Sequence, residues 1–457
     1  MRRGRWIVLL AALAAVAGCI GTARDEVDTQ SAQTPDTGAV EEVLAPPSEQ
    51  ALWSDPQLAP HPDFDQPTLT HVPEDAPEWW QPIDERELPD EVEGFEHLSQ
   101  QGEGWAGDGF AIFGSLAVNP DGEIFDVSDP TSPEVLTTFD TGVNGRQSLI
   151  IPYTDGTLVT VIASSSGEYP VWDITDPEDP RLLSTIEVDA PGHTLANPPG
   201  TPYIYNANSE GGYPGYAYNP ATEEGGKTEF IDLSDPRNPE VVGDWVNGYG
   251  CHAISFHMTE DKQRAYCAGV DATQIWDIED PLDPEVVSTS PMPHNQQPAP
   301  GLPILATVSH WVVVNEDASV MAVADETGGG AAPVCDAHVD AGDARASGPF
   351  ANVWFYDISD EENPELLSWI SPSTHVTEEQ RPGECTGHIG RMIPDADRDQ
   401  LVMTFYTGGT MLIDFTNPED PYIQDRWTGK DSMDSWYYNG YVFVGDRYDG
   451  IDVLALE

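Results

Sequence analysis

Short apolar segments alternate with polar turns along most of this chain, and one such unit recurs. Its first copy, IFDVSDPTSP at 124–133, places two apolar residues and an Asp before a turn built from a second Asp and two prolines. Further copies begin at 171, 230, 275, 355 and 412, and a shortened form, IDVLALE, occupies 451–457. Repetition on this scale is typical of folds assembled from one supersecondary unit.

A complete unit can be followed at 251–290. Its apolar runs predict four strands, over 252–258, 265–270, 273–278 and 285–290. The third strand carries the recurring motif, and an Asp-Pro turn reverses the chain into the fourth. We expect each motif to hold its Asp at one fixed place; these residues are Asp126, Asp173, Asp232, Asp277, Asp357, Asp414 and Asp452.

Four antiparallel strands repeated seven times predict an all-β fold, a seven-bladed β-propeller over 94–457. The seventh repeat contains three strands only, so its fourth must come from elsewhere. The segment GFEHLSQQ at 94–101 resembles the start of a fourth strand, and we expect this N-terminal strand to close the ring and remove its open edges. The first strand of blade one is weakly marked, near 104–106.

The repeat resembles the LVIVD repeat of exported bacterial and archaeal β-propellers. The similarity extends over 95–457 and is strongest from 385 onward, through CTGHIGRMIP, LVMTFYTGGTMLIDFTNPEDP and GIDVLALE. It implies the propeller fold. It implies no particular reaction, because members of that family generally lack an assigned one and fold alone does not determine function.

The first residues have the pattern of an export signal. Three arginines precede a short apolar run, and Val-Ala-Gly-Cys at 16–19 resembles the lipobox of lipoproteins. We therefore expect a signal peptide over 1–18 and a lipid on Cys19 that anchors the protein to the outer face of the cytoplasmic membrane. An ordinary secretory signal is the alternative. Residues 19–93, acidic and rich in proline, predict a disordered tether.

Charge and cysteine content narrow the possible partners. Eighty acidic residues against 18 basic ones give a formal charge of −62, which excludes a nucleic-acid partner and is typical of adaptation to high salt. Besides Cys19, four cysteines suit two disulfides in an exported protein. We favour Cys251–Cys267, on consecutive antiparallel strands, which leaves Cys335 and Cys385 as the second pair.

Four histidines stand at matching places, at the beginning of the first strand of a blade. They are His193, His252, His310 and His388. First strands are innermost in a propeller, so these imidazoles would surround one mouth of the central channel. Neutral imidazole suits Cu, Zn or Fe, and Asp434 in the seventh repeat could add a carboxylate.

A structural role for these histidines is equally consistent with the sequence. Gly192-His193 and Gly387-His388, with Trp172-Asp173 and Trp276-Asp277, resemble the pattern of WD40 propellers, where such residues join a hydrogen-bond network within the blade.

Long connections would gather at the same end of the propeller as the histidines, which predicts a binding site there. Its candidate ligand-binding residues are Arg146, Tyr213, Tyr216, His338, His375 and Trp436. Two hypotheses follow. The first is a lipid-anchored scaffold that binds a protein or small molecule on this face; the second is a metal-dependent enzyme with Cu, Zn or Fe at the channel mouth.

Overall fold

The computed structural model describes most of the chain from Glu78 to Glu457. Within that range it leaves out 82, 85, 87, 90–91, 104–108, 154, 190, 200, 209–226, 260–261, 270–271, 293–306, 328–352, 371–385, 394–397 and 430. The expected signal peptide, Cys19 and the tether up to residue 77 lie outside the described residues. Among the residues that are described, no helix has both the length and the apolar character needed to cross a membrane.

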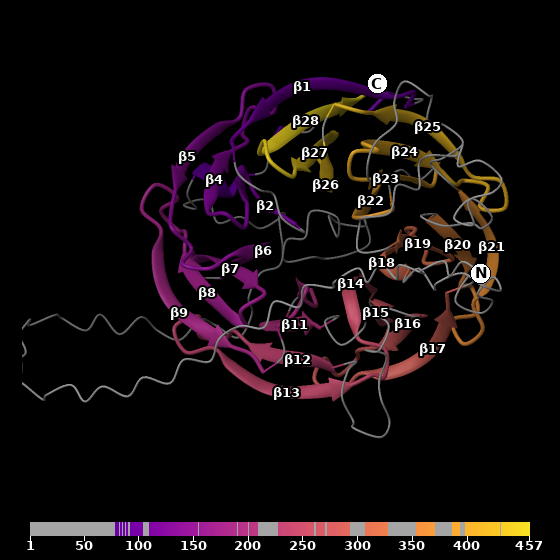
Figure 1. The fold of residues 1–457 in the computed structure, drawn as a ribbon, viewed down its shortest axis with the longest axis horizontal. Helices are drawn as coiled ribbons and strands as arrows, with labels where there is room; N and C mark the ends of the chain where they lie inside the picture. Colours follow the sequence, from indigo (N-terminus) through magenta and orange to yellow (C-terminus); the bar gives the residue numbers. More distant parts are fainter. Residues whose placement is uncertain are drawn as a thin grey trace, which may run out of the picture. The chain divides into compact units, whose positions relative to one another are not determined.

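Seven four-stranded antiparallel sheets form a ring of blades, which confirms the predicted seven-bladed β-propeller (Figure 1). In each blade the first strand lies toward the centre of the ring and the fourth lies outside. Blades one to three comprise β2 (Ala111–Phe113), β3 (Leu116–Val118), β4 (Glu123–Asp126), β5 (Glu134–Thr138); β6 (Gly145–Pro152), β7 (Leu158–Ser164), β8 (Glu168–Asp173), β9 (Arg181–Glu187); β10 (Thr194–Ala196), β11 (Tyr203–Ala207), β12 (Lys227–Asp232) and β13 (Glu240–Val246).

Blades four to six comprise β14 (Cys251–Met258), β15 (Gln263–Gly269), β16 (Ala272–Asp277), β17 (Glu285–Pro291); β18 (Thr307–Val314), β19 (Val320–Thr327), β20 (Val353–Asp357), β21 (Glu365–Ile370); β22 (Gly390–Ile393), β23 (Gln400–Thr404), β24 (Thr410–Asp414) and β25 (Tyr422–Trp427). Blade seven combines β26 (Ser432–Tyr438), β27 (Tyr441–Asp446) and β28 (Ile451–Leu456) with β1 (Phe95–Gln101). The strands of blade four match the four predicted over 251–290 to within two residues.

Burial follows strand position within a blade. The second and third strands are apolar and buried on both faces because each blade packs against two neighbours; β7, LVTVIAS, is buried throughout. Along the outer strands, exposed side chains alternate with partly buried ones, as at the end of β13. Apolar side chains from adjacent blades share clusters, and Ile275 of blade four lies in the same cluster as Phe355 of blade five and Ile413 of blade six. Burial of these apolar side chains between blades is the main stabilising contribution to the ring.

The recurring Asp closes its own turn. In six blades, an oxygen of the motif Asp accepts a hydrogen bond from the backbone N–H two residues later, at 2.8–3.0 Å; the pairs are Asp126–Ser128, Asp173–Thr175, Asp232–Ser234, Asp277–Glu279, Asp357–Ser359 and Asp414–Thr416. This local bond is the Asx turn that favours Asp where a chain reverses. The repeat is therefore a device for joining the third strand to the fourth.

Asp452 is the exception and corrects our alignment of the last repeat. In blade six, Gln400 opens the second strand and pairs with the motif Asp414. In blade seven, Tyr441 opens the second strand and pairs with Ala455. Ala455 is therefore the equivalent of Asp414, and Asp452 lies three residues before it on β28. Asp452 is buried, and Nε2 of His97 lies 2.7 Å from its carboxylate.

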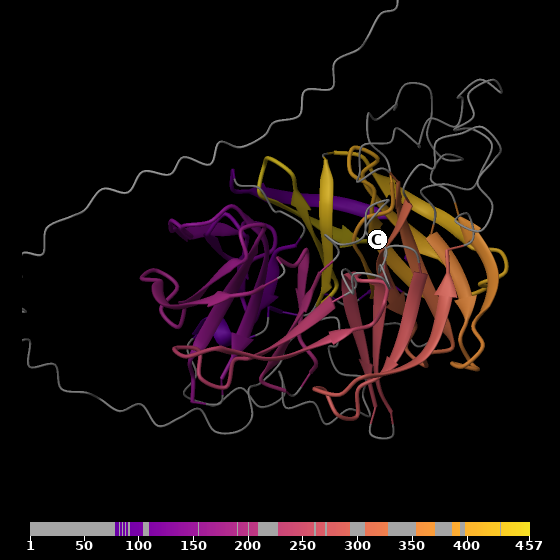
Figure 2. The same cartoon turned by 60° about the horizontal axis from the view of Figure 1, so that its bottom comes forward.

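The N-terminal strand closes the ring as predicted. β1 pairs antiparallel with β28, from Phe95 opposite Leu456 to Gln101 opposite Ile451, and lies along the outside of blade seven (Figure 2). His97 on this strand also stacks on Trp427 of blade six, with ring centroids 5.4 Å apart. Closure therefore joins the two ends of the described chain through one sheet.

The folded part begins before residue 94. A 3-10 turn, η2 (Glu78–Trp80), places Trp80 in the core against Phe113, with ring centroids 5.1 Å apart, and the carbonyl of Trp79 accepts the N–H of Ser115. Ile83 and Val92 are also buried. The last part of the expected tether therefore packs on apolar surface of the propeller. The first strand of blade one likewise lies later than expected, at Ala111–Phe113.

Cys251 and Cys267 form a disulfide between β14 and β15, which confirms the favoured pairing. Cys335 and Cys385 lie outside the described residues, so their pairing stays a prediction.

Candidate metal centre

A backbone irregularity at the inner end of four blades sets the position of the side chains that converge there. The register between first and second strands shifts at Gly145/Gln147, Cys251/Ala253, Ser309/Trp311 and Ser432/Asp434. The residue passed over in each shift occupies a β-bulge, which redirects a side chain. These bulge residues are Arg146, His252, His310 and Met433, and the register of blades three and six assigns the same place to His193 and His388, just before β10 and β22.

The bulge residues of consecutive blades form one continuous arc of side chains. The ring centroids of His193 and His252 lie 4.0 Å apart, those of His252 and His310 lie 3.9 Å apart, and those of His310 and His388 lie 4.2 Å apart. At one end of the arc, Arg146 donates to Nε2 of His193 at 2.6 Å. The structure thus brings together the four histidines that the sequence singled out.

A second arc comes from the ends of the second strands. The register gives blades two, five, six and seven one equivalent position at the end of the second strand. The residues there are Ser165, Glu326, Tyr406 and Arg447. Each contacts the bulge residue of its own blade. The contacts are Arg146 to Ser165 at 3.4 Å, His310 Nε2 to Glu326 at 3.9 Å, His388 to Tyr406 at 4.5 Å between centroids, and Arg447 to Met433 Sδ at 3.4 Å.

Backbone carbonyls fix the orientation of the imidazoles. Nδ1 of His310 donates to the carbonyl of His388 at 3.1 Å, and Nδ1 of His388 donates to the carbonyl of Met433. Nδ1 of His252 has no partner at hydrogen-bonding distance among the described residues. A carbonyl only accepts, so His310 and His388 each carry a proton on Nδ1, and the neutral ring of His310 presents an unprotonated Nε2. Metal-binding histidines are commonly held in this manner.

The imidazoles are kept neutral by their surroundings. Burial lowers the pKa of His193, His252 and His310 well below the usual value, and neighbouring cations or histidines lower it further. For His193, which retains some exposed surface, the second cause is the positive charge of Arg146. Neutral rings have lone pairs that no proton occupies at neutral pH, which is the state that binds a metal ion.

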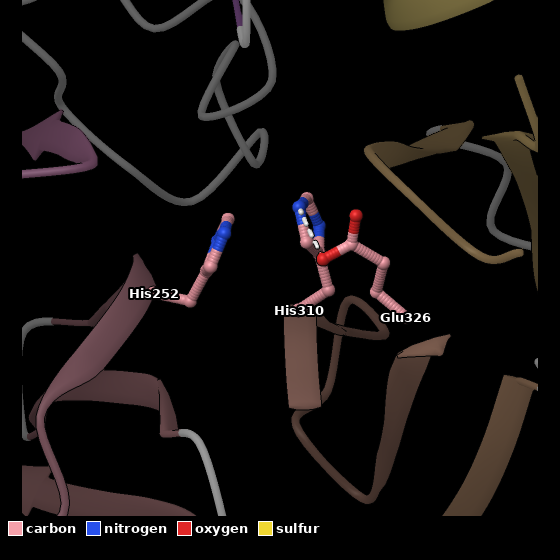
Figure 3. A group of neighbouring side chains, drawn as sticks. All are labelled: His252, His310 and Glu326. Atoms are coloured by element: carbon pink, nitrogen blue, oxygen red, sulfur yellow. Dashed lines mark ion pairs between the residues drawn. The ribbon is translucent and has the colours of Figure 1, made fainter. Parts of the chain in front are cut away.

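Three buried side chains converge closely enough to share one ion. Ligand atoms of His252, His310 and Glu326 all lie within 4.8 Å of one another, and Figure 3 shows the imidazole of His310 between the other two side chains. In a tetrahedral site with bonds of about 2.0–2.1 Å, ligand atoms lie roughly 3.3 Å apart. The 3.9 Å between His310 Nε2 and Glu326 Oε2 is therefore close to a coordinating arrangement.

Tyr406 orients the carboxylate of Glu326. Its hydroxyl donates to Oε1 at 2.6 Å, which leaves Oε2 facing His310. Its backbone has a positive φ of 52°, an uncommon conformation for a tyrosine, and is held by two hydrogen bonds with Ser432. Arg447 lies over the ring with its Cζ 5.0 Å from the centroid. The surrounding blades thus hold Tyr406 in a conformation that delivers its hydroxyl to Glu326.

Asp434 lies beside the arc and not within it. The bulge residue of blade seven is Met433, and Asp434 comes one place later. Its oxygens accept hydrogen bonds from the indole N–H of Trp436 and the backbone N–H of Ser435, both at 2.8 Å. Burial raises its pKa to about 6. Arg391 of blade six and the backbone of Phe110 also act on this carboxylate. It lies outside the group of converging ligands.

The other candidate residues divide into two groups. Arg146 lies at the end of the histidine arc, and the buried Trp436 lies next to Asp434. Tyr213, Tyr216, His338 and His375 lie outside the described residues, so their part in a binding site stays a prediction.

The WD40-like alternative finds little support in the geometry. Asp173 and Asp277 lie at the ends of third strands, and each accepts a hydrogen bond within its own Asp-Pro turn. The histidines lie at the opposite end of the blade. Gly192 has its own structural reason, since a Cβ there would meet the side chain of Asn206 at 1.7 Å. Gly192 is therefore required for close packing against Asn206, whereas the side chain of His193 contacts the neighbouring imidazole of His252.

Sequence reasoning missed Glu326 and Tyr406. The signal for Glu326 was present, since VMAVADET ends an apolar strand with two adjacent acidic residues. Burying carboxylates there is unfavourable without partners, so such a pair predicts a site. Nothing local marks Tyr406, whose role depends on the register between blades five and six.

Comparisons with known proteins support the fold and no closer relationship. No protein-family model and no curated protein matches this chain. Among solved structures, it is similar to the crystal structure of Raptor from Chaetomium thermophilum, with a TM-score of 0.50 and 9% sequence identity. The match covers 80% of this chain and 29% of that one. The class that fold and site define is therefore a seven-bladed β-propeller with a buried histidine and carboxylate cluster at one channel end.

Proposed function

We propose that this chain is an exported, lipid-anchored β-propeller that binds a transition-metal ion through His252, His310 and Glu326. The observation that carries the proposal is the convergence of these three ligand atoms within 4.8 Å. Two imidazoles and one carboxylate are the ligand set of catalytic zinc sites and of non-haem iron sites. Such a set leaves coordination positions open, which supports the hypothesis of a metal-dependent enzyme over that of a pure scaffold.

The propeller fold does not require these residues. The equivalent bulge position holds Arg146 in blade two and Met433 in blade seven, and both blades keep the same four-stranded sheet. Burying several imidazoles and a carboxylate in contact is unfavourable unless something compensates. A bound cation would compensate, because it attracts the charge of Glu326 and accepts the lone pairs of the rings.

Titration of metal-free protein with Zn²⁺ and Cu²⁺ tests this proposal. We expect one ion per chain, and a loss of affinity of 100-fold or more in the double variant His252→Ala, His310→Ala. The matched control is His97→Ala, His257→Ala, which also removes two histidines. His257 lies on the same strand as His252, but its ring bonds to the carbonyl of Glu316 away from the arc. Equal affinity in both double variants would refute the site.

The proposal includes the membrane anchor expected at Cys19. Mature protein should partition into detergent, and Cys19→Ser should release it into the aqueous phase. Partition that does not change in this variant would contradict the anchor without affecting the metal site.

A scaffold function stays the second candidate because the outer strands expose apolar side chains. Leu182 on β9 and Val241, Val242 and Val246 on β13 are 41–53% exposed, on neighbouring blades. Surface of this kind can receive a protein partner. Cross-linking on intact membranes would distinguish the candidates, because a scaffold would keep its partner in the double variant His252→Ala, His310→Ala. If the double variant Val241→Asp, Val246→Asp loses the cross-linked partner, the partner docks on this exposed surface of β13.

A further inference from the structure

A buried arginine on an innermost strand has one charged neighbour, Asp434, and no salt bridge to it. Arg391 belongs to β22, the innermost strand of blade six, and is 6% exposed. Its Cζ lies 4.3 Å from the ring centroid of Trp311 in blade five and 4.7 Å from that of Trp436 in blade seven. Among the described residues it forms no salt bridge, and its one hydrogen bond is from Nη1 to the carbonyl of Gly390 at 3.2 Å.

No other blade has a cation at this position. The register aligns Arg391 with one residue in each of the other blades: Ala111, Leu149, Ala196, Ser255, Val313 and Trp436. None of these side chains is charged. A guanidinium removed from water is unfavourable unless it is paired, and contact with aromatic faces offsets only part of that loss.

Two hydrogen-bond donors at this place lack acceptors. Nε of Arg391 and the indole Nε1 of Trp311 are buried, and neither has a hydrogen-bond partner within the described part of the chain. The nearby carboxylate of Asp434 attracts the guanidinium through its charge, but its oxygens accept hydrogen bonds from Trp436 and Ser435. Aromatic rings can satisfy the faces of a guanidinium, but its N–H groups point outward in its own plane and need oxygen acceptors.

We propose that Arg391 and Trp311 form a subsite for the carboxylate group of a small organic molecule. A planar carboxylate matches the planar fork of N–H donors on arginine, and the indole N–H supplies a further donor. The rings of Trp311 and Trp436 hold the guanidinium in place for this contact. Trp311 directly follows His310 in the chain, but the subsite uses none of the proposed metal ligands and does not depend on the ion.

Acetate is the probe, and the intrinsic fluorescence of Trp311 and Trp436 is the readout. Metal-free protein, dialysed free of chelator, is titrated with sodium acetate and separately with sodium chloride at matched ionic strength. We expect a saturable change with acetate alone. Arg391→Met should weaken acetate binding tenfold or more, while Arg391→Lys should retain part of it. The control is Arg264→Met, which removes an arginine that is ion-paired with Asp277 and Glu361 far along the blade.

Trp311→Phe keeps the proposal testable if Arg391→Met does not fold. This variant retains an aromatic face and loses the indole donor, so acetate should bind several-fold more weakly, with Trp436 still reporting. The proposal is overturned if acetate and chloride give the same unsaturable response, or if folded Arg391→Met or Trp311→Phe binds acetate as tightly as the wild type. Because the protein is free of metal, failure here leaves the zinc titration above unaffected.

Discussion

The two ends of this propeller are built on opposite plans. At one end, the Asp-Pro turns repeat almost unchanged, and each motif Asp bonds to the backbone of its own turn. At the other end, the bulge residues vary from arginine to histidine to methionine, and they contact the next blade. Residues that recur and are satisfied locally build the scaffold. Residues that vary and depend on neighbouring blades create a site.

The pH dependence of folding should separate the two ends most strongly. Burial lowers the pKa of His193, His252 and His310 in the folded state, so the unfolded chain takes up protons first as the pH falls. Stability of the metal-free protein should therefore fall below about pH 6.5, by about 1.4 kcal/mol per pH unit for each such histidine. Chemical unfolding at pH 7 and pH 5 measures this loss. In the double variant His252→Ala, His310→Ala the free energy of unfolding should fall less steeply, by up to about 3 kcal/mol per pH unit less than in the wild type. An identical pH dependence in the two proteins would contradict buried neutral rings.

Removing the charge of the carboxylate ligand should have the next largest effect. Glu326→Gln keeps the shape of the side chain and its contact with Tyr406, but it weakens coordination. We expect a decrease in Zn²⁺ affinity of about 10–100-fold, as for other changes close to a metal. Calorimetric titration measures it, and Glu316→Gln is the control, because that residue lies at the opposite end of the blade. An unchanged affinity would exclude Glu326 as a ligand.

Tyr406→Phe should have a smaller effect through positioning alone. The variant removes the hydroxyl that holds Glu326 Oε1 and keeps the ring beside His388. We expect about a tenfold loss of Zn²⁺ affinity, as for a residue that orients a metal ligand. The combined variant with Glu326→Gln should bind about as weakly as Glu326→Gln alone, since both act on one carboxylate. Additive losses would show that Tyr406 acts independently of Glu326.

The Asp-Pro end should respond in stability alone. Asp357→Ala removes the oxygen that accepts the N–H of Ser359, and we expect a loss of about 0.5–1.5 kcal/mol at neutral pH. The hydrogen bond to Ser359 lowers the pKa of Asp357, so its ionic contribution is present above about pH 4 and disappears as the pH falls through the folded value. Asp357→Asn retains the acceptor and should lose less. A change in Zn²⁺ affinity in either variant would show that the two ends are coupled.

The sequence predicted what local chemistry determines. Six full motifs and one shortened copy were enough for the ring, although their spacing is uneven. The incomplete last repeat was enough to identify β1 as the closing strand. The misplacement of Asp452 arose because IDV resembles IDF, and only the pairing of Tyr441 with Ala455 reveals the difference.

The site was predictable in part, for a physical reason. Histidines at matching places in successive repeats must converge, because first strands surround one axis. Glu326 and Tyr406 were not predictable in the same way, because their positions depend on which residues the bulges pass over and on contacts between blades. Met433 shows the limit most clearly, since one residue of register decides whether it or Asp434 joins the arc.

The metal content of protein purified without a histidine tag tests the central claim most directly. Elemental analysis should find about one transition-metal ion per chain in the wild type and in His97→Ala, His257→Ala. The same analysis should find almost none in His252→Ala, His310→Ala. Substoichiometric metal that does not differ among the three proteins would contradict a metal centre at the histidine end of the propeller.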